Sequence, residues 1–227
     1  MKCCISVFAS STAEARRLLT EGIRRTGLVE LRLDGIPKVK TERLLPVPKG
    51  EVIVTNRLRE EGGRFPGPEK DRVGLLQQAV SLGTDYVDLE IRTDPSLRKD
   101  LQKVIKDRSG RTRLILSHHD FDGTPPPEEL RRRWAQGRKA GADIVKIVTF
   151  AKEAEDNLRV LALIPYVRRK GGEIIAFCMG PEGKISRILA PLLGSYLTYV
   201  SPAKGRETAP GQLTLSEMKK LWRIVRG

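Results

Sequence analysis

The residue whose type and setting could do the most chemistry is Lys146, in the segment GADIVKIVTFA. The two residues on each side of it are apolar and β-branched, which is typical of a buried parallel strand. Burial disfavours the charged form of a lysine, so the free amine should become more populated. A free amine is a nucleophile toward a ketone or an aldehyde. The alternative is a lysine that reaches past the end of its strand into water and has no chemical role.

A base and an orienting group are present as well. The chain has two histidines, which are adjacent in LSHHDFDGTP, and a histidine is a candidate general base because it titrates near neutral pH. The alternative is a structural histidine whose ring bonds to the backbone. Glu90 ends the apolar segment DYVDLE, and a carboxylate beside an imidazole fixes its tautomer. Glu90, His119 and Lys146 therefore form a candidate set of orienting carboxylate, base and nucleophile.

These residues need elements that carry them to one place. Apolar stretches predict eight strands, at residues 3–8, 28–34, 52–55, 85–90, 113–117, 144–148, 174–179 and 197–200. Helical spacing predicts eight helices, at residues 10–26, about 40–45, 69–82, 95–108, 127–140, 152–170, 182–193 and 215–225.

This alternation predicts an α/β protein with a (β/α)8 TIM barrel, forming a single catalytic domain over residues 1–227. A doubly wound open sheet is the alternative. That fold usually has a glycine-rich loop after its first strand, and the corresponding FASSTAEA has no glycine.

In a barrel, catalytic residues lie at the carboxyl ends of the strands. Reactive residue types gather there in this sequence: Glu30, Arg32, Arg57, Glu90, Ser117, His118, His119, Lys146, Met179 and, in the loop after the eighth strand, Gln212.

Charge and composition bound the function classes. The 227 residues carry a formal net charge of +14, which raises the alternative of a nucleic-acid-binding protein. The basic residues are spread over many segments and mixed with acids, and aromatic residues make up 5%, so we expect no nucleic-acid partner.

No apolar run approaches the roughly 20 residues of a membrane span, so we expect no membrane partner and a cytoplasmic protein. Cys3, Cys4 and Cys178 lie in apolar runs and are interpreted as buried free thiols.

Read in order, eight segments resemble a known family. They are VELRLD, TNRLREEGG, DYVDLE, LSHHDF, DIVKIV, CMGPEGKISR, GSYLTYVS and TAPGQ. Together they resemble the type I 3-dehydroquinate dehydratases, the Schiff-base-forming enzymes of the shikimate pathway. The resemblance spans nearly the whole chain. It implies a syn elimination of water from 3-dehydroquinate to give 3-dehydroshikimate, with no cofactor. The sequence has two histidines and neither an HExxH nor an EF-hand-type motif, so we expect no metal.

The resemblance also implies roles for individual residues. Lys146 corresponds to the lysine that forms the imine, and His119 to the histidine that removes a proton and later returns one to the leaving hydroxyl. Glu90 would orient His119. His118 stands where many members carry a tyrosine, so it is not the expected base.

Further positions match substrate-binding residues of the family. Arg187 matches the arginine that binds the substrate carboxylate, although an exposed helix arginine is the alternative. The other matches are Glu30, Arg32, Arg57, Thr208 and Gln212, the last two in a loop, GRETAPGQ, that resembles a lid. Asp34 is interpreted as a support or a cap. Met179 either packs beside the imine or belongs to the core, and Ser201 has no assigned role.

Two questions stay open at this point. A class I aldolase or transaldolase-like enzyme would also use a barrel lysine. The two-arginine site for the substrate carboxylate and the His–Glu pair argue against this class of enzyme. The resemblance allows a homodimer, and the oligomeric state is not legible in the sequence.

Overall fold

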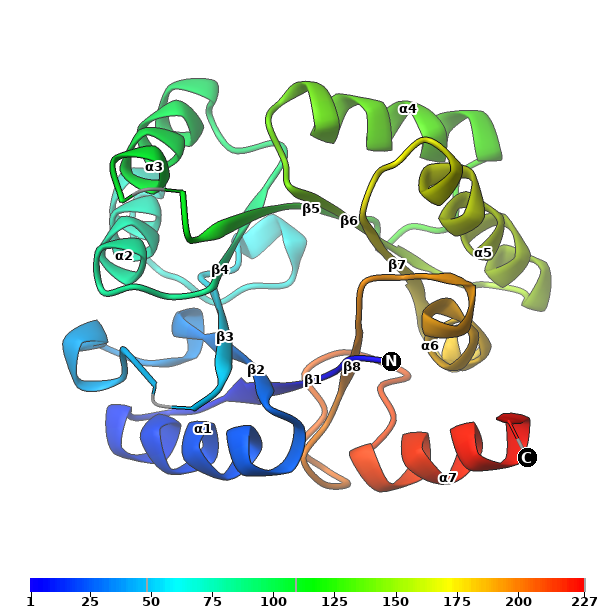
Figure 1. Cartoon of the computed structure of the whole chain (residues 1–227), viewed down its shortest axis with the longest axis horizontal. Coiled ribbons are helices and arrows are strands. Elements are labelled where there is room, and N and C mark those ends of the chain that lie inside the picture. Colours follow the sequence, from blue (N-terminus) through cyan, green and yellow to red (C-terminus); the bar gives the residue numbers. More distant parts are fainter. Residues whose placement is uncertain (48, 109, 227) are drawn as a thin grey trace. The chain divides into compact units, whose positions relative to one another are not determined.

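The computed structural model describes residues 1–47, 49–108 and 110–226, in which strands and helices alternate (Figure 1). The strands are β1 (Cys3–Phe8), β2 (Leu28–Arg32), β3 (Glu51–Thr55), β4 (Tyr86–Glu90), β5 (Arg113–His119), β6 (Ile144–Phe150), β7 (Ile174–Met179) and β8 (Thr198–Val200). The α-helices are α1 (Thr12–Thr26), α2 (Glu69–Ser81), α3 (Pro95–Asp107), α4 (Pro127–Lys139), α5 (Ala154–Arg169), α6 (Lys184–Leu189) and α7 (Leu215–Arg226). Short 3-10 helices lie at Leu33–Gly35, Thr41–Arg43, Arg59–Glu61 and Ala190–Leu193.

Hydrogen-bonded strands follow the order β7-β6-β5-β4-β3-β2-β1-β8. The pairs β1–β8, β2–β3, β3–β4 and β6–β7 are parallel. All eight predicted strands are present, and β5 and β6 each extend two residues beyond their predicted ends. The two histidines are consequently the last residues of β5 rather than part of the following loop.

Local sequence signals explain where the helices begin and end. Ser11 caps α1 by accepting a hydrogen bond from the Glu14 amide at 3.2 Å, and Gly27 ends it with φ of 73°. Pro95 opens α3 at a position where its missing N–H is no loss. Within the described ranges, no helix combines the length and apolar character that crossing a membrane requires.

The connection from β2 to β3 departs from the prediction. The second strand was expected to run to Asp34, but it ends at Arg32 and a 3-10 turn follows. Asp34 accepts backbone hydrogen bonds from Arg57 at 3.2 Å and Arg64 at 3.1 Å, and these contacts draw the chain out of the extended conformation. The short helix expected near residues 40–45 is a single 3-10 turn.

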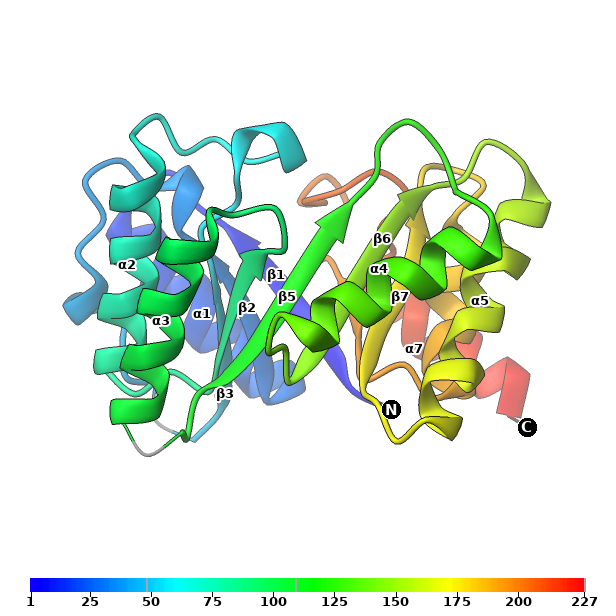
Figure 2. The ribbon, with the colours of Figure 1, turned by 90° about the horizontal axis from the view of Figure 1, so that it is seen from above.

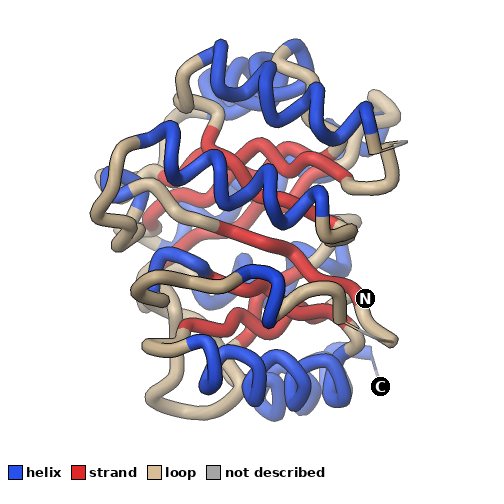
Figure 3. The backbone as a smooth tube through the Cα atoms, turned by 90° about the vertical axis from the view of Figure 1, so that its left-hand side faces the viewer, coloured by secondary structure: helices blue, strands red, loops and turns tan. Residues whose placement is uncertain are grey.

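The chain divides into two compact parts. One part is residues 7–116, in which α2 packs against α3 and against β3 and β4 (Figure 3). The other part is residues 1–6 with 117–227, in which α4 and α5 pack on β6 and β7 (Figure 2). Apolar side chains fill the core of each part; Ile53, Leu76 and Leu89 in the first and Ile147, Ile164 and Ile175 in the second have no exposed surface.

Candidate active site

The predicted site residues fall into two sets, one in each part of the chain. The part from 7 to 116 holds Glu30, Arg32, Arg57 and Glu90; the other part holds His119, Lys146, Arg187, Thr208 and Gln212. The pairing of Glu90 with His119 joins the two sets and stays a prediction.

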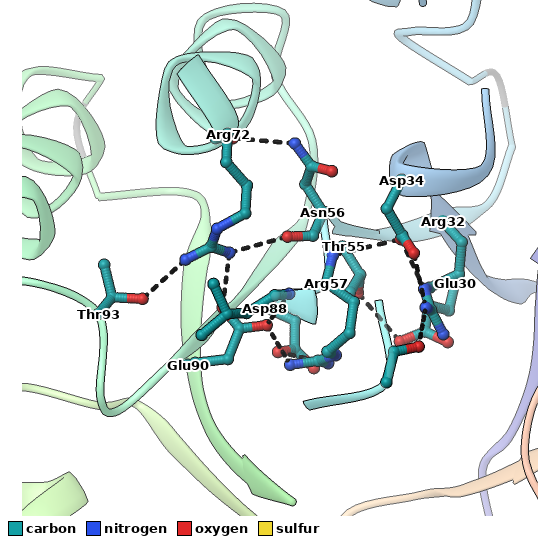
Figure 4. Close-up of polar contacts among 12 residues, drawn as sticks. Glu30, Arg32, Asp34, Thr55, Asn56, Arg57, Arg72, Asp88, Glu90 and Thr93 are labelled. Carbon is teal, nitrogen blue, oxygen red and sulfur yellow. Dashed lines mark hydrogen bonds and ion pairs between the residues drawn. The ribbon is translucent and has the colours of Figure 1, made fainter. Parts of the chain in front are cut away.

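Arg57 lies in the centre of the first set (Figure 4). Its Nη1 is 2.7 Å from Oε1 of Glu90, and its Nη2 is 2.8 Å from Oδ1 of Asp88. Burial alone would lower the pKa of Arg57, but the charges of Asp88 and Glu90 outweigh burial and raise the pKa above its usual value. Arg57 therefore stays charged, and two protein carboxylates already neutralise it.

A second arginine holds Glu90 from helix α2. Arg72, which is 1% exposed, donates from Nη1 to Oε2 of Glu90 at 2.6 Å and to the backbone oxygen of Asn56 at 2.8 Å. Its Nη2 donates to Oγ1 of Thr93 at 2.9 Å (Figure 4). Because the Leu58 amide also donates to Oε1 of Glu90 at 3.0 Å, both carboxylate oxygens are fixed in place.

Arg32 and Asp34 form a bidentate pair beside this cluster. Nε and Nη2 of Arg32 each lie 2.8 Å from an oxygen of Asp34, so the predicted supporting role of Asp34 is confirmed. Burial raises the pKa of Asp34, but the hydrogen bond and charge of Arg32, with the amide of Arg57, outweigh it and hold the pKa below its usual value. Glu30 accepts from Oγ1 of Thr55 at 3.0 Å (Figure 4).

Lys146 anchors the second set. It is 4% exposed, so its predicted burial is confirmed, and β6 continues beyond it to Phe150. Its Nζ lies 4.4 Å from the ring centroid of Tyr199 on β8. The amine thus faces an aromatic ring inside the protein instead of reaching water at the end of a strand.

Arg187 is buried, and among the described residues it has no carboxylate partner. It is 1% exposed, its Nη2 donates to the backbone oxygen of Pro210 at 3.3 Å, and its Cζ lies 4.4 Å from the ring centroid of Phe177. No carboxylate of the described residues lies within ion-pairing distance, and its Nε has no hydrogen-bond partner among them. Burial lowers the pKa of Arg187 to about 10, so the side chain is charged at neutral pH. The alternative of an exposed helix arginine is wrong.

The lid-like loop is fastened at its carboxyl end. The side-chain oxygen of Gln212 accepts from the Thr208 amide at 2.7 Å and from its hydroxyl at 3.3 Å. The oxygen of Pro210 accepts from the Gly180 amide at 3.2 Å. Gly211 has φ of 74°, and a Cβ there would lie 2.1 Å from the oxygen of Gly180, so only glycine fits. Residues 203–207 are exposed.

The remaining predicted residues lie at the ends of β5 and β7, after β8, and in the apolar strands. His118 and His119 are half-buried, and Met179 is buried at the end of β7. Ser201 donates to the oxygen of Ala203 at 2.8 Å, which stabilises the start of the lid-like loop. Cys4 and Cys178 are buried free thiols as predicted, whereas Cys3 is partly exposed.

Sequence reasoning missed Arg72 and Asp88. Asp88 precedes Glu90 by two residues on β4, so the alternation of a strand could have placed both carboxylates on one face. Arg72 lies 18 residues from Glu90 in a helix rich in charges, and nothing local distinguishes it from its neighbours.

Comparison with known proteins gives one consistent answer. The family model described as Type I 3-dehydroquinase matches residues 3–227. A 3-dehydroquinate dehydratase from Syntrophobacter fumaroxidans is 40% identical over 232 residues, which cover 98% of this chain and 95% of that protein. A 3-dehydroquinate dehydratase structure from Aquifex aeolicus VF5 is 31% identical, with a TM-score of 0.81, and the match covers 99% of this chain and 98% of that one.

The fold comparison agrees. A type I 3-dehydroquinate dehydratase structure from Clostridium difficile has a TM-score of 0.86 at 22% identity, over 99% of this chain and 91% of that one. The predicted (β/α)8 TIM-barrel fold is confirmed, as is the resemblance on which the predicted roles rest. The chain therefore belongs to the type I 3-dehydroquinase family.

Proposed function

We propose that this chain, a 3-dehydroquinate dehydratase of the shikimate pathway by its family, eliminates water through an imine on Lys146. The observation that carries the proposal is the burial of Lys146 on β6, at 4% exposure and facing the Tyr199 ring. A lysine amine held in the interior can add to the carbonyl carbon of a ketone and form an imine. The reaction is that of a carbon–oxygen hydro-lyase.

In the first step, the nitrogen of Lys146 adds to the ketone carbon, and the ketone oxygen leaves as water. The protonated C=N bond then draws electrons from the adjacent carbon, which acidifies its C–H bond. His119 takes that proton, and the electron pair moves to the nitrogen as an enamine.

In the second step, the enamine electron pair returns and expels the hydroxyl on the next carbon. His119 gives its proton to this hydroxyl, which leaves as a second water. Hydrolysis of the imine consumes one water, frees Lys146 and releases 3-dehydroshikimate. The net change is the loss of one water. Glu90, held by Arg57 and Arg72, would orient His119.

The substrate carboxylate is assigned to Arg187. Arg32 and Arg57 already pair with Asp34, Asp88 and Glu90. Arg187 has no such partner among the described residues, and a guanidinium binds a carboxylate bidentately. Glu30 and Arg32 are assigned to the substrate hydroxyls, and Gln212 with Thr208 to closure over the bound substrate.

Borohydride reduction tests the proposal. Reduction of the wild type in the presence of 3-dehydroquinate should add one ligand mass, located on Lys146 by peptide mapping. Lys146→Met should gain no mass and should lose turnover. A mass gain on that variant, or on a different peptide of the wild type, would contradict the assignment. Absence of the conjugated enone absorbance with wild type and 3-dehydroquinate would contradict the reaction itself.

The domain organisation, the localisation and the oligomeric state complete the proposal. We assign the whole of residues 1–227 to one catalytic domain, which should unfold in a single transition that coincides by circular dichroism and by fluorescence. We place the enzyme in the cytoplasm, which cell fractionation tests. A homodimer and a monomer are both consistent with the family, and light scattering on a sizing column separates them.

A further inference from the structure

Two aromatic rings connect the two proposed cationic side chains of the second set. Nζ of Lys146 lies 4.4 Å from the ring centroid of Tyr199, and Cζ of Arg187 lies 4.4 Å from that of Phe177. The rings of Phe177 and Tyr199 meet edge to face, with centroids 6.0 Å apart and planes at 63°. The four groups therefore form a continuous series of contacts, from the Lys146 amine through the Tyr199 and Phe177 rings to the Arg187 guanidinium.

The strands dictate this arrangement. In the parallel pair of β6 and β7, Lys146 is opposite Ile175 and Val148 is opposite Phe177. Opposed residues of a parallel pair share a face and alternate residues repeat it, so Lys146 and Phe177 point the same way. Thr198 donates to the backbone oxygen of Arg187 at 3.0 Å, which ties the residue next to Tyr199 to the helix that carries the arginine.

The face of an aromatic ring attracts a cation, and the attraction grows when water is excluded. The four side chains are at most 4% exposed, so they meet that condition. The nitrogen of Lys146 would be positive as an ammonium and again as a protonated imine. A ring face beside it stabilises the protonated imine, which is the form that withdraws electrons from the substrate.

We propose that Tyr199 and Phe177 are positioning residues for the two cations. Tyr199 holds the Lys146 nitrogen and keeps its imine protonated, whereas Phe177 sets the plane in which Arg187 meets the substrate carboxylate. The edge contact between the rings fixes the separation of the two cations. This inference rests on the proposed function, since it takes Lys146 as the imine-forming residue and Arg187 as the carboxylate ligand.

A fluorine series at position 199 separates the electronic role from packing. Tyr199→Phe keeps the ring face and should keep kcat within about threefold of the wild type. Phenylalanine analogues with one, two and three ring fluorines, incorporated at position 199 alone, have nearly the same shape and a progressively weaker negative face. We expect kcat to fall with each fluorine, by about 10-fold over the series, at unchanged thermal stability. A flat series overturns the role of Tyr199.

The same series at position 177 should change a different parameter. Because Phe177 faces Arg187, fluorination should raise KM by about 5- to 10-fold and leave kcat within about twofold. A fall in kcat without a rise in KM, or no change in either parameter, overturns the role of Phe177. A role in packing alone would give no trend along either series.

The chain supplies a matched control. Trp134 and Tyr166, on α4 and α5, also meet edge to face at 6.0 Å, and Cζ of Arg131 lies 4.9 Å from the Tyr166 centroid. Fluorinated phenylalanines at position 166 should change neither kcat nor KM. Borohydride trapping distinguishes the two levels of failure. A wild type that is not trapped on Lys146 overturns the proposed function together with this inference, whereas a trapped wild type with flat series overturns this inference alone.

Discussion

Arg72, on helix α2, places its Nη1 2.6 Å from Oε2 of Glu90 at the end of β4. Both side chains are at most 1% exposed, so the pair is fully buried. Removing one partner of a buried ion pair leaves the other charge uncompensated, which costs about 3–5 kcal/mol. Arg72 is thus a structural requirement for the position of the Glu90 carboxylate.

The first prediction concerns this pair. Arg72→Leu should lower the free energy of unfolding by about 3 kcal/mol, measured by urea denaturation, and should lower kcat as Glu90 shifts. Arg17→Leu is the control, because Arg17 pairs with Glu21 at 3.9 Å on the surface of α1 and is 64% exposed. Such pairs contribute at most about 1 kcal/mol. Equal losses in the two variants would contradict the importance of burial.

The second prediction is a change that stabilises the protein and destroys binding. Arg187→Met removes a buried charge that has no carboxylate partner among the described residues, so the free energy of unfolding should rise by about 1–3 kcal/mol. KM should rise by about 100-fold because the substrate carboxylate loses its partner. Arg57→Met should destabilise the protein instead, since it removes a positive charge that the buried carboxylates of Asp88 and Glu90 pair with. The prediction fails if both variants shift stability in the same direction.

The third prediction separates the two histidines. His119→Ala should still form the trapped imine with 3-dehydroquinate, but its dehydration rate should fall by about 100- to 10,000-fold. His118→Ala should retain most of the rate, since that position is not the expected base. Rapid dehydration by His119→Ala together with a slow His118→Ala would assign the base to His118.

The fourth prediction concerns acid stability. The pKa of Asp34 is lower in the folded protein than in the unfolded chain, because Arg32 and the Arg57 amide outweigh the effect of burial. The unfolded chain therefore binds the proton more readily, and the stabilisation is present above about pH 4 and lost as pH falls through the folded-state pKa. Asp34→Asn should unfold at a lower temperature than the wild type at pH 7, and the gap should narrow below about pH 4. Asp100→Asn, at an exposed position on α3, should show no such narrowing.

The fifth prediction concerns the lid-like loop. Gly211→Ala places a methyl group 2.1 Å from the Gly180 oxygen, so the loop must shift and KM should rise as Gln212 moves. Gly205→Ala is the control: its φ is also positive, at 79°, but no atom lies within 4 Å of the added carbon. It should cost only about 1 kcal/mol of backbone strain, with little effect on KM. Similar KM values for the two variants would argue against the close contact.

The fold was predictable because its signals are local. The apolar run around Lys146 marks a buried strand, and Ser11, Gly27 and Pro95 mark helix ends. The early end of β2 was not predictable, since it depends on hydrogen bonds to Asp34 from amides 23 and 30 residues away. The ion-pair partners of buried side chains were not predictable either, because these partners are also distant in the sequence.

Within the site, residue types were easier to predict than partners. The family resemblance implied that Arg57 and Arg187 bind the substrate, but their environments differ in a way that no spacing reveals. Arg57 is already paired with Asp88, 31 residues away, whereas the contacts of Arg187 are a ring and a carbonyl oxygen. Only the packed structure shows which guanidinium still lacks an acidic partner among the described residues.

The carbonyl of Pro210 accepts from both the Gly180 amide and the Arg187 guanidinium. An anion that binds the guanidinium must share it with this carbonyl, so anion binding alters one of the two hydrogen bonds that Pro210 accepts. Amide exchange of the exposed residues 203–207 with deuterated solvent should therefore change when substrate binds, even in a protein whose Lys146 has been replaced.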